Sequence, residues 1–221
     1  MRSNTGWMAA ALILVAGTGV VAWRFAFLVA PPTWTGEARA LAKTLGVRPG
    51  TCVADIGAGD GAMAEAMSAM VGASGRVLAT ELSAGRLRDL AARKARRGLA
   101  NLEIVAARVD DTGLPEGGCD ALYLRHVFHH LRDRPAMAAR LTRATKTGGR
   151  IAVIDFPPDA LWFHGADHGV SADEVADAFE TAGWRQRARR DNWGGGTFLV
   201  VFERGGAPAG PGAAAAVAVR D

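Results

Sequence analysis

Acidic and glycine residues with the types and spacing of a ligand-binding loop stand together in the segment "VADIGAGDGAMAEAM", residues 53–67. An apolar run leads into Asp55, and Gly57 and Gly59 follow at alternate positions before a run of helix-forming residues. Glycine permits a positive φ and allows close approach of backbone to a ligand. The helix that follows presents free N–H groups at its start. The segment is therefore typical of a binding loop between a strand and a helix.

The glycine spacing alone leaves the ligand open. Gly57, Gly59 and Ala62 satisfy the G-x-G-x-x-A pattern of dinucleotide sites. However, carboxylates such as Asp55 and Asp60 would repel a bound pyrophosphate. The acids instead favour a ligand that carries an ammonium or sulfonium group.

Further acids follow the next two predicted strands. Glu81 ends the second strand, where a carboxylate can accept hydrogen bonds from ribose hydroxyls. Asp110 and Asp111 follow the third strand, where either can hold an adenine amino group, with Asp111 the preferred of the two. Because the carboxyl ends of parallel strands converge at one edge of a sheet, these acids predict one shared cavity.

Basic side chains follow the fourth predicted strand. Arg125 is expected to line the same cavity, and His126, His129 and His130 have the i, i+3, i+4 spacing of one helix face. His126 is nearest to the strand end and is our candidate catalytic residue, as a general base if the attacking atom arrives protonated. His129 and His130 are expected to pack or hydrogen-bond beneath it.

Two more histidines, His164 and His168, fall in the loop after the fifth strand. Such loops can close over a site, so we expect contact with substrate there. The five histidines have no accompanying frame of cysteines or carboxylates, and we predict no metal site.

The elements that must position these residues alternate between strands and helices. Strands are expected at 51–56, 76–81, 102–107, 119–124, 150–156, 184–190 and 197–204, and helices at 37–46, 60–70, 84–97, 126–145 and 171–183. Alternation of this kind predicts an α/β fold with a parallel sheet covered on both faces. The last two strands are joined without a helix and should pair antiparallel. The prediction is a Rossmann-like, doubly wound, mostly parallel seven-stranded sheet with an antiparallel last strand.

Four segments in this order resemble the class I S-adenosylmethionine-dependent methyltransferases. They are "VADIGAGDG", the acid Glu81, "LPEGGCDALYLRHVFHHL" and "TKTGGRIAVIDF", in which Thr147 replaces the family's usual proline. The resemblance covers residues 37–204 and is closest to the quinone and small-molecule branch, where His126 replaces an asparagine. It implies S-adenosyl-L-methionine as cofactor, with its amino-acid part against Asp55, Gly57 and Gly59 and its ribose against Glu81.

The N-terminal segment has the composition of a membrane anchor. Between Arg2 and Arg24 stand 21 uncharged residues, which as a helix would span about 31 Å, enough for a bilayer core. Trp7 and Trp23 near its ends suit the membrane interface. A cleaved signal peptide is the alternative interpretation. The expected organisation is an anchor at 1–30, a linker at 31–36, the methyltransferase domain at 37–204 and a disordered low-complexity tail at 205–221.

Charge and cysteine content say less about the partners and chemistry of the protein than the motifs do. Lys and Arg number 26 against 22 Asp and Glu, and the basic stretch 86–97 is expected to be a solvated helix face, with an anionic membrane surface as the alternative partner. Two cysteines make neither a disulfide framework nor a metal cluster.

These features predict a methyltransferase acting on a small or lipid-associated molecule, held at the inner or cytoplasmic membrane by a single-pass helix, with its catalytic domain facing the cytoplasm. Few aromatic residues and no "(N/D)PPY"-type motif argue against nucleic-acid substrates. The alternatives are a non-catalytic cofactor-binding or scaffolding module on the same fold, and a nicotinamide oxidoreductase.

Overall fold

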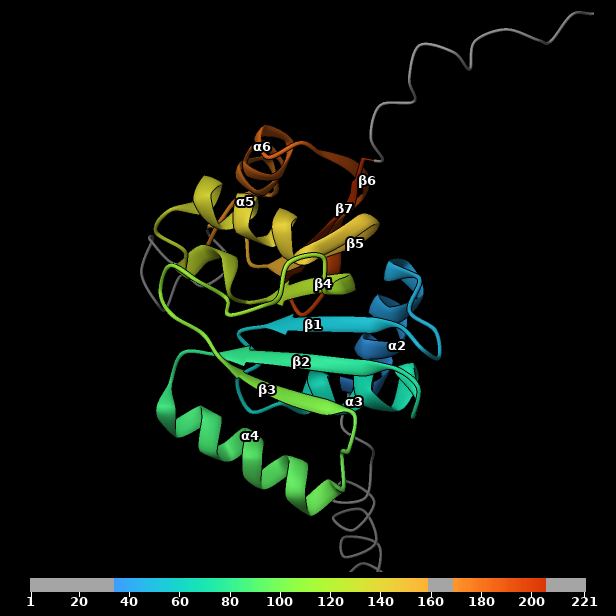
Figure 1. The fold of residues 1–221 in the computed structure, drawn as a ribbon. Helices are drawn as coiled ribbons and strands as arrows, with labels where there is room; N and C mark the ends of the chain where they lie inside the picture. The colour runs from blue at the N-terminus through green and yellow to red at the C-terminus, as the bar shows by residue number, and fades with distance from the viewer. Residues whose placement is uncertain (1–33, 159–168, 206–221) are drawn as a thin grey trace, which may run out of the picture.

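One seven-stranded sheet in the order β3-β2-β1-β4-β5-β7-β6 forms the centre of the computed structural model (Figure 1). The structure describes residues 34–158 and 169–205. The strands are β1 (Cys52–Ile56), β2 (Arg76–Glu81), β3 (Leu102–Ala106), β4 (Cys119–Arg125), β5 (Thr145–Asp155), β6 (Trp184–Gly194) and β7 (Thr197–Arg204). Only β7 runs against its neighbours, pairing antiparallel with both β5 and β6. The predicted mixed sheet with an antiparallel last strand is thus confirmed.

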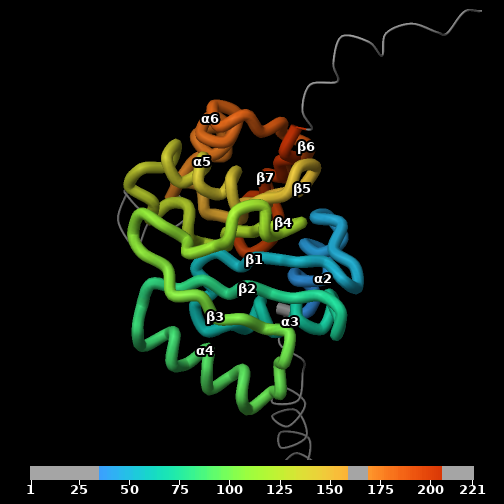
Figure 2. Tube along the Cα trace, viewed as in Figure 1, coloured from blue at the N-terminus to red at the C-terminus, as the bar shows by residue number. Residues whose placement is uncertain are grey.

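Helices cover both faces of the sheet. The α-helices are α2 (Trp34–Leu45), α3 (Ala62–Val71), α4 (Ala84–Arg97), α5 (Arg134–Ala144) and α6 (Ala172–Thr181), and a 3₁₀ turn, η1, spans Phe128–His130. One buried layer joins α2, α3 and α4 to the sheet, and the other joins η1, α5 and α6 to its opposite face. Figures 1 and 2 show these two sets of helices on opposite sides of the strands.

Alternation along the strands explains why both faces are apolar. In β1, Val53 packs into the layer of α3 while its neighbour Ala54 packs into the layer of α5. Every residue of β1 is buried, as expected for a central strand covered on both sides. The apolar run before the glycine loop is therefore the middle of the core, and it fixes where that loop begins.

Helix α2 runs against the parallel strands. Near its start, Glu37 pairs with Arg125 at the carboxyl end of β4, with 3.0 Å between Oε1 and Nε. At its other end, the carbonyl of Thr44 accepts from Arg150, at the opposite end of the strands. The N-terminal end of α2 therefore lies at the sheet edge where the parallel strands end.

Two expected boundaries differ from the structure. Helix α2 begins at Trp34, inside the segment expected to be a linker, with Glu37 in the first turn, where an acid favours helix formation. The continuous helix expected over 126–145 is also wrong: a short 3₁₀ turn comes first, and α5 begins only after Asp133, whose carboxylate accepts from Ala136 N as an N-cap.

The expected anchor at 1–30 and the expected tail at 205–221, apart from Gly205, lie outside the described residues. Within 34–158 and 169–205, no helix combines the length and apolar character needed to cross a membrane.

Candidate functional site

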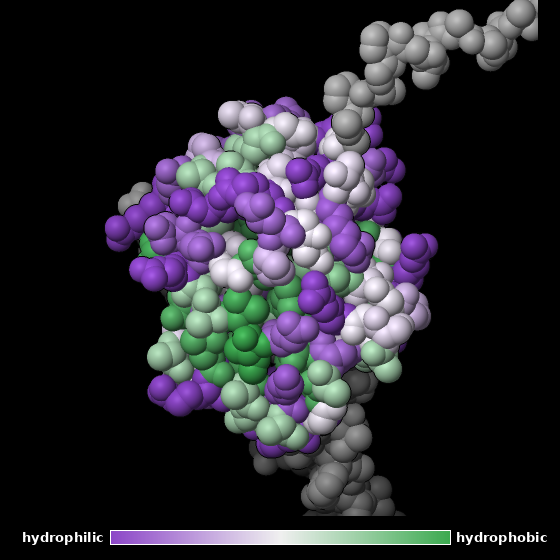
Figure 3. All heavy atoms as spheres, in the orientation of Figure 1, coloured by the Kyte–Doolittle hydropathy of each residue, from purple (hydrophilic) through white to green (hydrophobic). Residues whose placement is uncertain are grey.

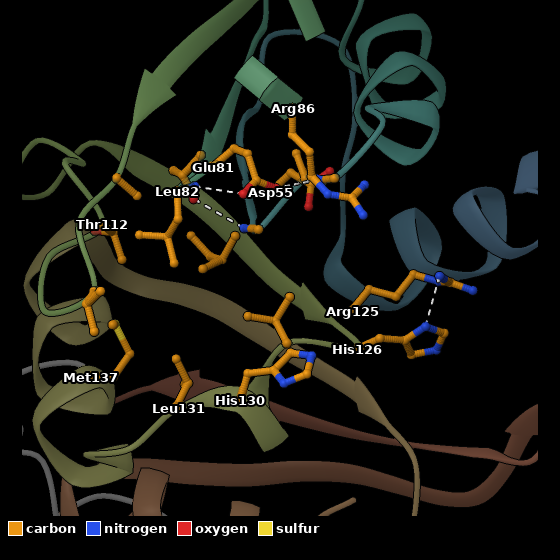
Figure 4. A pocket seen from close by; sticks show the side chains of 18 of the residues that line it. Asp55, Glu81, Leu82, Arg86, Thr112, Arg125, His126, His130, Leu131 and Met137 are labelled. Atoms are coloured by element: carbon orange, nitrogen blue, oxygen red, sulfur yellow. Dashed lines mark hydrogen bonds between the residues drawn. The ribbon is translucent and has the colours of Figure 1, made fainter. Parts of the chain in front are cut away.

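A cavity of about 550 Å³ opens at the carboxyl edge of the parallel strands (Figure 4). Its lining comes from the segments that follow β1, β2, β3 and β4, together with Met137 of α5. Two lining side chains, Leu82 and Val109, are the exposed large hydrophobics of the described part. Figure 3 shows apolar atoms gathered over β2 and β3 in a largely hydrophilic face. The site therefore combines an apolar rim with the charged groups at the strand ends.

The glycine loop needs glycine for two separate reasons. Gly57 and Gly59 have φ angles of 72° and 59°, in the left-handed region that favours glycine. A Cβ on Gly57 would also stand 2.7 Å from Val127 Cγ2, and one on Gly61 would stand 2.5 Å from Leu90 Cδ2. The loop is thus pressed between the β4 end and α4, and its backbone borders the cavity.

Glu81 is held in place by this loop. Its Oε2 accepts a hydrogen bond from Gly59 N at 3.1 Å, and its Oε1 accepts from Leu82 N at 2.7 Å and Ser83 N at 3.0 Å. A carboxylate offers about four acceptor positions, so at least one remains for a ligand hydroxyl. The acid expected to hold a ribose therefore lines the cavity in a fixed orientation.

Asp55 is a buried carboxyl group at the end of β1. It is 3% exposed, and its Oδ2 has no hydrogen-bond partner among the described residues. Burial raises the pKa of Asp55 to about 7, opposed by the Tyr123 hydroxyl and the charge of Arg125. A buried acceptor without a partner is costly. A cationic ligand group in the cavity would supply the missing interaction.

The other acids at the strand ends do not all line the cavity, and those that do already have hydrogen-bond partners. Asp60 lines the cavity, but Arg93 of α4 binds both its carboxylate at 3.0 Å and its carbonyl oxygen at 2.6 Å. Asp111 lines the cavity, whereas Asp110 does not. Asp111 Oδ1 accepts from Gly113 N at 3.1 Å, which closes the turn after β3.

Arginines balance the acids of the lining. Arg86, Arg108, Arg125 and Arg132 all border the cavity. The site is therefore bipolar, with arginines as well as carboxylates in its lining, and is not ringed by negative side chains alone. Such a lining suits a ligand that carries both an ammonium or sulfonium group and a carboxylate.

Arg125 ends β4, and His126 follows it directly (Figure 4). Arg125 Nη1 lies 3.2 Å from His126 Nδ1, and Glu37 binds Arg125 while accepting from Trp193 Nε1 at 3.3 Å. His126 has a φ of 57°, which is rare for a residue with a side chain and is often found at functional sites. Its ring packs against that of Phe156 in a tilted arrangement, with centroids 4.2 Å apart.

The imidazole of His126 is uncharged at neutral pH. Burial and the neighbouring Arg125 lower the pKa of His126 to about 4. Its Nε2 is buried without a hydrogen-bond partner in the described part, and the residue lines the cavity. His126 can therefore hydrogen-bond a ligand, but it is a weak base.

The three clustered histidines do not share one helix face, because His126 has a left-handed backbone and precedes η1. His129 is tied to Asp155 at the end of β5: its Nδ1 lies 2.6 Å from Oδ1, and its backbone N–H donates to Oδ2 at 3.1 Å. The ring of His130 packs against that of His129 at a tilt, with centroids 3.8 Å apart. His130 lines the cavity, whereas His129 does not. His164 and His168 lie outside the described residues.

Sequence reasoning missed Asp155 and Glu37. Asp155 ends β5, and Asp55 stands one residue before the end of β1, so the same strand-end argument would have found Asp155. Glu37 carries no local signal, since only the packing of α2 brings it to Arg125. No group of three or more metal-binding side chains occurs within 34–158 and 169–205.

A sheet in this order, with a glycine loop after β1 and an acid ending β2, defines a nucleoside-binding α/β domain with its cavity at the strand ends. Residues 54–153 match the family model described as a methyltransferase domain. A SAM-dependent methyltransferase from Aquifex aeolicus superposes with a TM-score of 0.69 at 24% identity, over 78% of this chain and 93% of that one, which shows a shared fold.

Two curated relatives are methyltransferases as well. The ubiquinone/menaquinone biosynthesis C-methyltransferase UbiE of Marinomonas sp. is 29% identical over 112 residues, 50% of this chain and 45% of that protein. The nocamycin O-methyltransferase of Saccharothrix syringae is 31% identical over 125 residues, 56% of this chain and 45% of that protein. The matched region thus spans about half the length of these relatives. The family model, the methyltransferase relatives and the shared fold together support a class I S-adenosylmethionine-dependent methyltransferase domain, with S-adenosyl-L-methionine as its cofactor.

Proposed function

We propose that this protein is a methyltransferase that transfers a methyl group from S-adenosyl-L-methionine to a small or lipid-associated acceptor. The observation that carries the proposal is that Asp55 and Glu81 line the same cavity. Asp55 presents a buried oxygen without a partner, and Glu81 is fixed beside the glycine loop with acceptor capacity left. A sulfonium nucleoside bearing an ammonium group would supply a cation near Asp55 and ribose hydroxyls near Glu81.

Each lining segment then has a proposed task in cofactor binding. Asp55, Gly57 and Gly59 would border the amino-acid part and Glu81 the ribose. Asp111, which lines the cavity, is a better placed partner for the adenine than Asp110. Arg125, which is held by its ion pair with Glu37, would lie where the cofactor meets the acceptor.

When bound, the cofactor supplies a methyl group on a positively charged sulfur, which is already a good leaving group. The protein then has to align the acceptor and exclude water. His126 is our candidate for the group that orients the acceptor. Its neutral imidazole has a buried nitrogen without a hydrogen-bond partner in the described part, and its left-handed backbone fixes the direction of the side chain. His130 also lines the cavity and is a proposed acceptor contact.

The buried Asp155–His129 pair gives His130 a rigid support. Asp155 is fully buried and accepts from His129, from the His129 backbone and from Phe156 N at 2.9 Å. It therefore joins the end of β5 to η1, in which the ring of His130 packs against that of His129.

The orientation of α2 supports a lipid-associated acceptor. Its N-terminal end lies at the cavity edge through the Glu37–Arg125 pair. A membrane helix in residues 1–30 would join the domain at this point, so the cavity would be tethered near the bilayer surface. A tether of this kind raises the effective concentration of a bilayer-dissolved acceptor. We propose a single-pass location at the inner or cytoplasmic membrane, with this domain facing the cytoplasm.

Two measurements on the full-length protein test the proposal. Titration calorimetry with S-adenosyl-L-methionine should give saturable binding that Asp55→Asn abolishes. Asp89→Asn, which changes an exposed acid on α4, is the matched control and should bind normally. Incubation with cofactor labelled in its methyl group and a membrane lipid extract should then give a labelled small molecule.

The outcomes separate the alternatives. Binding without any labelled product, from lipid or water-soluble extracts, would favour the non-catalytic module. Absence of binding would reject the cofactor assignment, and binding of NADH in its place would support an oxidoreductase. A labelled product only from the water-soluble extract would keep the enzyme and reject the lipid-associated acceptor.

A further inference from the structure

The only two cysteines of the chain meet at the sheet edge opposite the cavity. Cys52 begins β1 and Cys119 begins β4, and these strands are parallel neighbours. Their Sγ atoms lie 2.6 Å apart although the residues are 67 positions apart in sequence. Both thiols are free, and both residues are buried. The pair is remote from the cofactor cavity and has no part in the proposed methyl transfer.

Charged groups from four strands lie around this pair. From β2, Arg76 donates from Nε to Cys52 Sγ at 3.3 Å and from Nη2 to the Gly118 carbonyl at 3.3 Å. From β4, Asp120 accepts from Cys52 N at 2.8 Å, and its other oxygen pairs with Lys146 of β5 at 2.8 Å. Arg76 also faces Glu103 of β3 at 4.0 Å. The guanidinium is thus the positive group in direct contact with sulfur.

The two thiols differ in acidity. The hydrogen bond from Cys119, with the contact of Arg76, lowers the pKa of Cys52 to about 7, against burial and the charge of Asp120. The same hydrogen bond and burial raise the pKa of Cys119 far above its ordinary value. Cys52 is therefore the thiolate of the pair and Cys119 the thiol that keeps its proton.

Solvent reaches this edge of the sheet. A cleft of about 430 Å³ is lined by Thr51 and Asp120, which adjoin the two cysteines in the chain. Cys52 keeps 5% of its surface exposed, against 1% for Cys119. Neither cysteine lines this cleft, but Cys52 is the more exposed residue of the two, so we expect a small oxidant to reach it first.

We propose that Cys52 and Cys119 are a redox modification site, which a peroxide converts into an intrachain disulfide. The Cys52 thiolate attacks one peroxide oxygen, the O–O bond breaks, and Cys52 becomes a sulfenic acid while hydroxide leaves. Cys119 sulfur then attacks Cys52 sulfur, the S–S bond forms and the S–O bond breaks. The Cys119 proton leaves with the departing hydroxide as water. Two thiols are oxidised by two electrons, and the peroxide is reduced to water.

The bond would connect the starts of the two strands whose other ends carry Asp55 and Arg125. It closes a loop of 67 residues and so restricts the unfolded chain, which stabilises the folded state. The oxidised protein should therefore unfold at a higher temperature than the reduced protein, and a thiol reductant should reverse the difference.

The test uses the reduced full-length protein, treated with a small excess of hydrogen peroxide. The sample is then denatured, and its free thiols are alkylated before intact mass spectrometry. The expected product is a monomer that takes up no alkylating agent and has lost two hydrogens. Cys119→Ser should accumulate sulfenic acid on Cys52, trapped with a dimedone-type probe, whereas Cys52→Ser should stay unmodified. The asymmetry distinguishes a thiolate and its resolving partner from two equivalent thiols.

The role of Arg76 is tested by the pH dependence of the oxidation rate. The rate should rise with pH through about 7, as the Cys52 thiolate forms. Arg76→Gln should shift this profile to higher pH and slow oxidation several-fold at pH 7, whereas Arg88→Gln on α4 should leave it unchanged. Two alkylatable thiols in the treated wild type, equal reactivity of the two single variants, or disulfides only between molecules would each overturn the proposal.

Discussion

The carboxylate of Glu81 accepts a hydrogen bond from the backbone N–H of Gly59, with 3.1 Å between Oε2 and N, and so joins the ends of β2 and β1. A charged side chain is thereby fixed by the same loop that borders the cavity. The contact explains why the acid and the glycines act together, since the loop orients the acid and the acid satisfies an amide of the loop.

Replacing Glu81 with glutamine tests this relationship. The amide NH₂ cannot accept hydrogen bonds, so at least one of the three backbone donors loses its acceptor. We expect a loss of about 1–3 kcal/mol in the free energy of unfolding and a rise in the cofactor Kd of at least roughly tenfold. Urea unfolding and calorimetry measure the two effects. Glu103→Gln, an exposed acid on β3, is the control, and equal behaviour of the two variants would contradict the assigned role.

Cofactor binding should depend on pH through Asp55. The pKa of Asp55 is raised to about 7 by burial, and a cationic ligand favours its ionised form. Affinity should therefore increase as pH rises from 6 to 8, with proton release on binding. Calorimetry in buffers of different ionisation enthalpy measures that release. A pH-independent affinity in the wild type would argue against contact between Asp55 and the bound cation.

The free energy of unfolding should depend on pH through Asp55 in the opposite direction to cofactor affinity. Its pKa is higher in the folded than in the unfolded chain, so its contribution is most favourable below about pH 4 and is lost as pH rises through about 7. At pH 8 the ionised group costs the folded state roughly 4 kcal/mol. Asp55→Asn should therefore raise the melting temperature by several degrees at pH 8 and less at pH 5, while abolishing cofactor binding. A lower melting temperature at pH 8 would contradict this.

The neutral His126 should orient the acceptor and leave the cofactor unaffected. His126→Asn removes the imidazole and retains a residue that tolerates a positive φ. We expect a lower kcat with the cofactor Kd changed less than about twofold. Because the pKa of His126 is about 4, the wild-type pH–rate profile should show no ionisation of this residue near neutrality. An unchanged kcat in the variant would remove His126 from the mechanism.

Gly57 is expected to be required for packing as well as for backbone conformation. A Cβ there would meet Val127 Cγ2 at 2.7 Å, and the φ of 72° adds strain, so Gly57→Ala should cost about 1–3 kcal/mol. Gly117→Ala combines a φ of 58° with open space and isolates the conformational cost of about 1 kcal/mol. Adding Val127→Ala to Gly57→Ala should recover part of the difference. Equal destabilisation by the two single variants would show that the close contact has no effect.

Local patterns in the sequence determine the fold and the edge of the sheet that carries the site. The apolar runs that end at Asp55 and Glu81 form buried strands because alternating strands and helices cover both faces of a parallel sheet. The glycine after β1 marks a close approach of backbone, and the shared direction of the strands brings their terminal acids to one cavity.

Only the tertiary structure decides which polar groups are available there, because that depends on partners far away in the chain. Arg93 on α4 binds the carboxylate of Asp60, which is then less available to a ligand. Asp155 on β5 hydrogen-bonds His129, which does not line the cavity. Desolvation by the folded core sets the ionisation of Asp55, and the pairing of β1 with β4 brings together two cysteines 67 residues apart. Side-chain type and spacing therefore locate the chemistry, while long-range packing sets the charge, orientation and accessibility of each group.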